Sequence, residues 1–238
     1  MNTLTVTATY RSQLFQLLAL GFTHPVDAFH RVLVDDSYAR ALVTAAAGAQ
    51  CSGHFSHTET HDFDDFEADY IHLFQIGRGG KPCMALTAGD HKEIAQEQGR
   101  PEFLLEYSGW YRHFGLRINE DEDANELPDH LVCQLEFMAW LAHLEDTSQE
   151  KPESLMGYQR AQRDFLQRHL QPYLEVVVTE LQHLAGRPRS NPFYLSLAAR
   201  ALEASDIMLD QLSASLATAD QADNSKGPDE IAAVNLWG

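Results

Sequence analysis

Apolar residues recur along most of the chain at steps of three and four, which is the spacing of an amphipathic helix. The pattern is clearest from 126 to 144, where four apolar residues would line one face and contact a core: Leu131, Leu135, Met138 and Leu141. Pro128 suits the first position of this helix because its missing N–H loses no hydrogen bond there. Asp129 would follow in the first turn, where a carboxylate meets unpaired backbone N–H groups and the positive end of the helix dipole.

Asp129 and His130 form a polar pair at the mouth of this predicted buried helix. A carboxylate beside an imidazole can be a catalytic pair, a metal-ligand pair or a hydrogen-bonding corner that fixes a loop. From these two residues alone we favour the structural corner over the two chemical alternatives.

The same period predicts helices over most of the remaining chain. They cover 14–21, 25–47 as one broken helix or two short ones, 62–74, 101–114, 155–169, 173–184 and 192–216. Asp62 is a suitable N-cap for the helix at 62–74, and Gly115 is a suitable C-cap after 114. The run from Val176 to Val178 would suit a strand, but the helical period on both sides of it favours a helix.

Two segments lack the helical period. Residues 48–61 and 75–88 are predicted loops, the second an ordered loop rich in Gly and Pro. Residues 219–238 are polar, and we expect them to be mostly disordered. The sequence therefore predicts an all-α fold, with one helical-bundle domain at 1–218 and a C-terminal tail at 219–238.

Composition indicates where in the cell the protein is expected. The chain has 238 residues, of which 44% are apolar, enough for a substantial core. No apolar run approaches the roughly 20 residues of a membrane helix, and the N-terminus lacks the order of a signal peptide, so we expect a cytoplasmic protein. The three cysteines are widely spaced and odd in number, which predicts reduced thiols rather than disulfides or a thiolate zinc site.

The net charge indicates which classes of binding partner are favoured. The chain has 17 basic and 35 acidic residues, a net charge of −18, which disfavours nucleic acid and anionic membranes and favours a basic partner. The acids gather in two groups without Lys or Arg: Glu59, Asp62, Asp64, Asp65, Glu67 and Asp69, and then Glu120, Asp121, Glu122, Asp123, Glu126 and Asp129. A solvated surface and a docking patch for a cationic ligand both explain these groups.

Few motifs indicate catalysis. The segment from Gly77 to Lys81 resembles a phosphate-binding loop, but Pro82 follows the lysine where Ser or Thr is required. Four potential metal ligands lie close together in the sequence: Cys51, His54, His57 and His61. They could bind one metal ion only if the Gly-containing loop that carries them were helical. His61 and Asp62 leave open an all-α metal-dependent phosphohydrolase of the HD type. Without a nucleophile–base arrangement, we expect no enzyme activity, no catalytic residue, no metal and no cofactor.

Several motifs together resemble one known family, over residues 10–212. They are YIHLF at 70–74, Gly77, Pro82, YRHFG at 111–115 and LPDHLVCQLEFM at 127–138, with weaker similarity at 169–173 and 191–194. Their order and spacing are similar to those of the TorD/DmsD/NarJ-type redox-enzyme maturation chaperones. The chain departs from the usual pattern at 84–87, after Pro82, and at Tyr173, where the family usually has Trp.

The resemblance implies a cytoplasmic, all-helical chaperone of TorD-like fold that is dedicated to a molybdenum-cofactor oxidoreductase. Such chaperones bind the apo catalytic subunit, often at its twin-arginine leader, and hold it until the cofactor is inserted. The GRGGKPC segment at 77–83 is further similar to chaperones of the dimethylsulfide, selenate, chlorate or ethylbenzene oxidoreductase group. A metal-dependent HD-type phosphohydrolase and an acidic protein-binding adaptor are the alternatives.

A twin-arginine leader is a cationic segment followed by an apolar one, so its receptor should place carboxylates beside an apolar groove. We expect the predicted loop at 75–88 to meet Asp129 and His130 there. The predicted client-binding residues are Tyr70, Leu73, Phe74, Gly77, Pro82, Pro128, Asp129, His130 and Glu136. For Leu73 and Phe74 a plain core role is the alternative, and for Gly77 and Pro82 it is loop shape alone. The chain would act as a monomer or a homodimer, without nucleic acid or stable membrane association.

Overall fold

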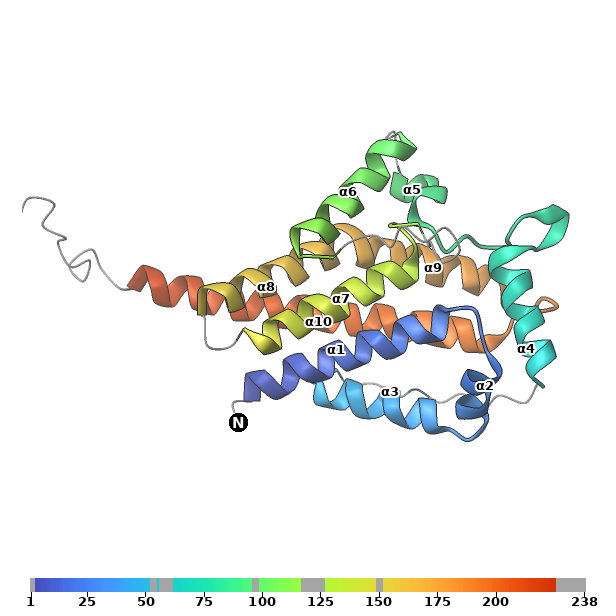
Figure 1. Ribbon diagram of the computed structural model, residues 1–238, viewed down its shortest axis with the longest axis horizontal. Coiled ribbons are helices and arrows are strands. Elements are labelled where there is room, and N and C mark those ends of the chain that lie inside the picture. Colours follow the sequence, from blue (N-terminus) through green and yellow to red (C-terminus); the bar gives the residue numbers. More distant parts are fainter. Residues whose placement is uncertain are drawn as a thin grey trace, which may run out of the picture.

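The computed structural model describes residues 3–51, 55, 62–95, 99–116, 127–148 and 152–225, and helices are the regular elements of these ranges (Figure 1). The long helices lie side by side along the long axis of the molecule: α1 (Thr3–Phe22), α7 (Leu131–Thr147), α8 (Pro152–Phe165), α9 (Gln171–Leu184) and α10 (Pro192–Ser225). Helix α1 packs along α7, and α10 packs against α8 and α9.

Shorter helices surround this bundle. Helices α2 (Asp27–Val34) and α3 (Ser37–Gly48) follow α1, and α3 packs against it. Helix α4 (Phe63–Tyr70) crosses one end of the bundle, while α5 (Lys92–Ala95) and α6 (Arg100–His113) stand on the side opposite α3 (Figure 1). Among the described residues, extended pairing is limited to a single bridge between Thr87 and His130, so the predicted all-α class is confirmed.

Helix α7 is the central element of the core. It is buried on more than one face because it packs between α1 and α8. Leu131, Leu135, Met138 and Leu141 are fully buried, as the heptad-like spacing predicted, and Phe137 on another face is also enclosed. A helix that is apolar on nearly every side belongs inside a protein, which explains why this stretch organises the fold.

Local sequence signals set several helix ends as expected. Asp62 caps α4 by accepting a hydrogen bond from the N–H of Asp65 at 3.0 Å, and Asn191 caps α10 in the same way through Phe193 at 3.0 Å. Gly115 follows α6 with a φ of 82°, the left-handed conformation that glycine adopts most readily. The valine run lies within α9, and 25–47 forms two helices.

The predicted start of α7 at Pro128 is wrong. The helix begins at Leu131 with His130 as its N-cap, and Pro128 and Asp129 lie in a preceding turn. The reason is that His130 is extended and that Asp129 O and Leu131 N–H form hydrogen bonds with the loop at 86–88, a long-range contact that helix signals do not report. The Asp129 carboxylate consequently accepts from Gly89 N–H rather than from the first turn of α7.

Two other boundaries differ from expectation. The helices predicted at 155–169 and 173–184 form one continuous run, in which a π-helical turn, η5 (Leu166–Leu170), joins α8 to α9. This turn ends two residues before Pro172, which has no N–H for an α-helical ladder. Helix α10 continues to Ser225, past the predicted domain end at 218, while 226–238 lie outside the described residues.

A buried polar network connects three of the long helices. Arg11 on α1 donates to Glu145 on α7 at 2.7 Å and to Gln162 on α8 at 3.3 Å. Both glutamines of α8 donate to the same carboxylate, Gln159 to one oxygen and Gln162 to the other, each at 2.7 Å. Glu145 is 1% exposed, so this ion pair depends on full hydrogen bonding for its stability.

None of the described helices is long and apolar enough to cross a membrane.

Candidate functional site

The predicted loop at 75–88 begins where α4 continues into a π-helical turn, η1 (Ile71–Gln75). It then contains two short 3₁₀ turns, η2 (Arg78–Gly80) and η3 (Ala88–Asp90), and its tip projects from the α4 end of the molecule (Figure 1). Ile76 is 65% exposed at this tip. The base of the tip is closed by hydrogen bonds from Gly77 N–H to Lys81 O at 2.7 Å and from Met84 N–H to Leu73 O at 2.9 Å.

The second half of the loop pairs with the chain that precedes α7. Leu131 N–H donates to Leu86 O at 2.8 Å, and Ala88 N–H donates to Asp129 O at 3.1 Å. These two bonds flank the bridge between Thr87 and His130. The loop and the Asp129–His130 pair are therefore neighbours in space, although they are far apart in sequence.

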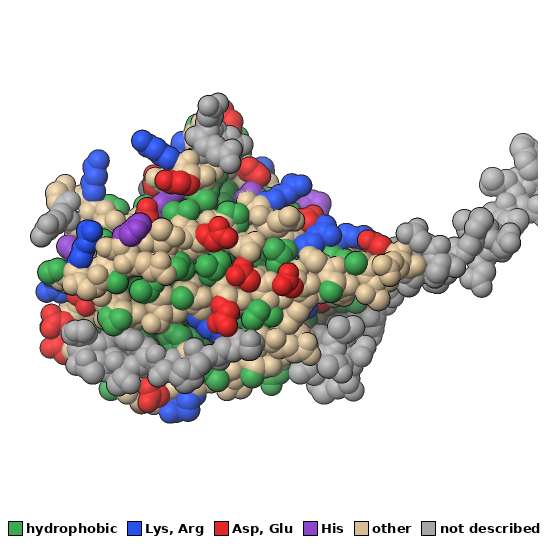
Figure 2. Space-filling view, turned by 180° about the vertical axis from the view of Figure 1, so that it is seen from behind, with side chains coloured by type: hydrophobic (Ala, Val, Ile, Leu, Met, Phe, Trp, Pro, Cys, Tyr) green, Lys and Arg blue, Asp and Glu red, His purple; other side chains and the backbone are tan. Residues whose placement is uncertain are grey.

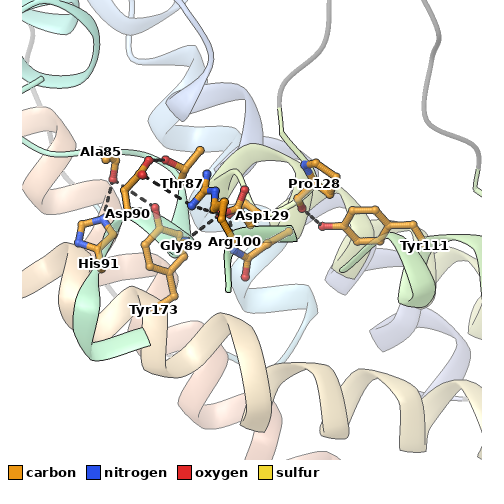
Figure 3. A network of polar contacts seen from close by, with 11 residues as sticks. Ala85, Thr87, Gly89, Asp90, His91, Arg100, Tyr111, Pro128, Asp129 and Tyr173 are labelled. Carbon is orange, nitrogen blue, oxygen red and sulfur yellow. Dashed lines mark hydrogen bonds and ion pairs between the residues drawn. The ribbon is translucent and has the colours of Figure 1, made fainter. Parts of the chain in front are cut away.

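Asp129 is the buried centre of this corner (Figure 3). Its side chain is fully enclosed, and its Oδ2 accepts a hydrogen bond from Gly89 N–H at 2.7 Å. The same oxygen lies 3.3 Å from Nη1 of Arg100, whose side chain is 33% exposed. Arg100 also lies 3.6 Å from Asp90, so one arginine bridges a buried and an exposed carboxylate.

Three tyrosines surround the Asp129 carboxylate. Tyr111 donates to Pro128 O at 2.6 Å, and Tyr173 donates to Ala85 O at 3.3 Å (Figure 3). Burial raises the pKa of Tyr107, Tyr111 and Tyr173, and the nearby negative charge of Asp129 raises each pKa further. Their hydroxyl groups therefore remain protonated hydrogen-bond donors at neutral pH.

Not every polar atom in this corner is paired. Oδ1 of Asp129 and the hydroxyl of Tyr107 have no hydrogen-bond partner within the described part of the chain. Buried polar atoms in folded proteins are nearly always paired. The corner therefore retains capacity to accept one further donor at Asp129.

The two histidines of the region serve different structural roles. His130 accepts the N–H of Val132 through Nδ1 at 3.3 Å, which caps α7. His91 contacts Ala85 O through Nε2 at 2.9 Å, and its Nδ1 lies 3.3 Å from Glu180 on α9. The contact with Glu180 attaches the end of the 85–91 segment to α9, whereas the His130 contact stays within the start of α7.

The predicted aromatic and leucine residues of the site are largely internal. Tyr70 is 3% exposed and donates to Phe22 O at 3.2 Å. Phe74 packs edge-on against Tyr70 with ring centroids 5.2 Å apart. Leu73 is also buried, but it lines a small cavity of about 60 Å³ beside the start of α10. Leu73 therefore borders an open space.

The other predicted residues lie at the surface or in turns. Pro82 and Glu136 are exposed, Glu136 on α7. A Cβ atom at Gly77 would come within 2.8 Å of both His72 O and Lys81 O, so glycine is required there for space. The loop thus brings Gly77 and Pro82 to its tip, while Asp129 and His130 lie at its base.

Of the first acidic group, Glu59 lies outside the described residues and Asp62 caps α4. The other four acids lie on α4, and Figure 2 shows acidic side chains at this end of the molecule. Glu67 pairs with His24 at 3.0 Å, and Asp69 pairs with Arg189 at 3.3 Å. In the second group, 120–126 lie outside the described residues, and Asp129 is the buried anchor. His54, His57 and His61 also lie outside the described residues, whereas Cys51 is buried and its pKa is raised by burial to about 11.

Sequence reasoning missed Arg100, Gly89 and Arg189. Arg100 begins α6, where a cation is unfavourable to the helix dipole, and that mismatch could have indicated a carboxylate partner. A Cβ at Gly89 would collide with the Arg100 guanidinium, so a side chain there would move Arg100 from its present position. Arg189 has a φ of 62°, a left-handed conformation that the neighbouring sequence does not predict.

In the described ranges, no group of three or more His, Cys, Asp or Glu side chains could hold a metal ion. Asp62, part of the HD-type alternative, uses its carboxylate as a helix cap. The described site is therefore a projecting loop fastened to a buried polar corner, an arrangement that suits a binding protein.

Comparison with known proteins agrees with this class. Residues 34–179 match the family described as the nitrate reductase delta subunit. The dimethyl sulfide dehydrogenase assembly chaperone of Rhodovulum sulfidophilum is 37% identical over 231 residues, which cover 94% of this chain and 91% of the relative. The perchlorate reductase assembly chaperone of Dechloromonas aromatica (strain RCB) is 34% identical over 179 residues, 72% of this chain and 77% of the relative.

A shorter match is the chlorate reductase assembly chaperone of Ideonella dechloratans, 40% identical over 111 residues, 47% of this chain and 54% of the relative. No solved structure matches the chain significantly. The chain belongs to the family of TorD/DmsD/NarJ-type redox-enzyme maturation chaperones, as its motifs predicted. It is an assembly chaperone and not an enzyme.

Proposed function

We propose that this protein is a cytoplasmic chaperone that binds the apo catalytic subunit of a molybdenum-cofactor oxidoreductase at its twin-arginine leader. It holds the subunit until the cofactor is inserted and the enzyme can be exported. The observation that carries the proposal is the nearly full-length similarity to an assembly chaperone of dimethyl sulfide dehydrogenase. A client of that oxidoreductase group is the narrower expectation.

Charge supports recognition of a cationic leader. The net charge of −18 attracts a peptide with adjacent arginines, and acidic side chains stand at the end of the molecule that carries α4 (Figure 2). The exposed tip of the 76–82 loop lies at the same end (Figure 1). Binding and release at this end would need no covalent chemistry.

We propose two roles for the predicted site residues. Gly77 and Pro82 belong to the part of the loop that a client can reach. Asp129, His130 and Tyr111 belong to the base that holds this part in position. We propose that Asp129 acts mainly by fixing the loop, while its unpaired Oδ1 offers one further acceptor.

Calorimetric titration with a synthetic twin-arginine leader from a dimethyl sulfide dehydrogenase-type enzyme tests the proposal. We expect saturable micromolar binding that weakens when the two arginines of the leader are replaced by lysine, because lysine cannot form the planar bidentate contact. An equally tight lysine leader would refute arginine recognition. Absence of binding to either leader would refute the leader as the recognised element.

A further inference from the structure

A surface pocket lies between α4 and the segment that joins α9 to α10. It has a volume of about 390 Å³. Asp65 and Asp69 line it from α4, and 187 and 189–192 line it from the joining segment. Its walls thus carry two carboxylates and two guanidinium groups at the end of the molecule where the exposed loop projects.

Asp69 is the enclosed member of this pocket. It is 6% exposed, and a buried carboxylate is stable only when a cation or several donors compensate its charge. Arg189 provides the cation, with Nη1 at 3.3 Å from Oδ1 of Asp69. Asn191 donates to the other oxygen at 3.4 Å.

Arg189 fills this position loosely. Its second nitrogen lies 3.7 Å from Asp65, so its two contacts go to different carboxylates and neither is short. A bidentate arginine–carboxylate pair has N–O distances of about 2.7–2.9 Å. The Arg189 side chain is 44% exposed and its backbone has a φ of 62°, a conformation that is unfavourable for a residue with a Cβ. The contact with Asp65 joins two exposed side chains and contributes little stability, so Asp69 is the main partner of Arg189.

A smaller apolar pocket adjoins the first. Four leucines line it, Leu73, Leu181, Leu184 and Leu195, together with the joining segment at 185–186 and 190–192. The two pockets share 190–192 as a common wall. The segment that carries Arg189 therefore also closes the apolar pocket.

We infer that Asp69 and Asp65 form a subsite for an arginine side chain of the client, and that Arg189 occupies this subsite until the client arrives. A client guanidinium displaces Arg189, which releases the 185–190 segment and opens the apolar pocket beside Leu73. The occupant is an arginine followed by apolar residues, because a carboxylate pocket continues directly into a leucine-lined one. This inference rests on the proposed recognition of a twin-arginine leader. It adds that Arg189 of the chaperone competes with the client arginine for the same subsite.

Two matched variants test the competitor. Arg189→Ala removes the occupying guanidinium, whereas Arg187→Ala removes the same charge from the same exposed segment and the same pocket. The described residues show no ion pair for Arg187. We expect Arg189→Ala to bind the twin-arginine leader about two- to fivefold more tightly than the wild type, the scale of one long, partly exposed ion pair. Arg187→Ala should not gain affinity.

Asp69→Asn tests the subsite itself. In this background Arg189→Ala should no longer increase affinity, and thermal unfolding of Asp69→Asn checks that the bundle remains folded. Hydrogen exchange gives an independent readout, since amides at 185–190 of the wild-type chain should exchange faster when leader is bound.

The outcomes separate the inference from the function on which it rests. If both arginine variants bind the leader as the wild type does, or gain affinity equally, the Arg189 competitor is overturned while leader recognition stands. Slower exchange at 185–190 on binding would also overturn it. If neither the wild type nor any variant binds the leader, leader recognition and the subsite fail together.

Discussion

Replacing Asp129 tests whether the buried corner is a structural clamp. Asp129→Ala removes the carboxylate that accepts from Gly89 at 2.7 Å and pairs with Arg100 at 3.3 Å. A hydrogen bond to a charged group contributes about 1.5–3 kcal/mol, and the Arg100 pair adds little because that side chain is partly exposed. We expect the free energy of unfolding to fall by about 2–4 kcal/mol.

Urea and thermal unfolding, followed by circular dichroism, measure this change. For a chain of this size the expected loss of stability lowers the midpoint temperature of unfolding by about 4–16 °C. Asp129→Asn keeps an oxygen that can accept from Gly89, so its loss should be smaller, at about 1–2 kcal/mol. Hydrogen exchange at Ala88 and Gly89 should accelerate in Asp129→Ala more than elsewhere.

Glu136→Gln is the matched control, because Glu136 is an exposed carboxylate on α7. Its stability should stay within about 0.5 kcal/mol of the wild type. An Asp129→Ala protein as stable as the wild type, with unchanged exchange at 88–89, would refute the clamp. If leader binding were then lost as well, Asp129 would be a direct client contact instead.

Three further predictions concern the interior. Glu145→Leu should lower the unfolding free energy by about 3–5 kcal/mol, because it leaves Arg11 buried without its anion, and Arg11→Met in the same chain should restore much of the loss in urea titrations. Burial lowers the pKa of His169 from its usual 6.5, although Glu106 opposes this shift. Neutral His169 therefore stabilises the fold fully above pH 6.5, and this contribution is lost as the pH falls below that value. Between pH 7 and 5.5 the free energy of unfolding should fall less steeply with pH in His169→Gln than in the wild type. An unchanged slope would contradict this role of His169. Cys51, with a pKa raised to about 11 and 2% exposure, should resist iodoacetamide at pH 8 in the native protein while the half-buried Cys83 reacts, as mass spectrometry would show.

The helical spacing of apolar residues was enough to predict most of the helices. The spacing of Leu131, Leu135 and Met138 identified both the central helix and its buried face, because helix period and burial are properties of neighbouring residues. The Asp62 cap is equally local, since donor and acceptor lie three residues apart. Such features can be derived without knowing where the rest of the chain lies.

The candidate site depends on contacts that local patterns do not contain. Asp129 was expected to stabilise the first turn of α7, but its partner is Gly89, 40 residues away in sequence. Asp69 appeared as one acid among several, although its cation, Arg189, lies 120 residues further on. The motifs named the segments of the candidate site, and only the fold shows which of their side chains are buried and which are exposed.

The buried network of Arg11, Glu145, Gln159 and Gln162 fixes how α1 can dock. A purely apolar seam tolerates a helix that slides by one turn or rotates, whereas a charge inside the core is compensated in one position only. Helix α1 therefore has a single register against α7 and α8, whether it comes from the same chain or from a second copy. A dimer that exchanges α1 would have to rebuild the same ion pair, so helix exchange would preserve the architecture of each half.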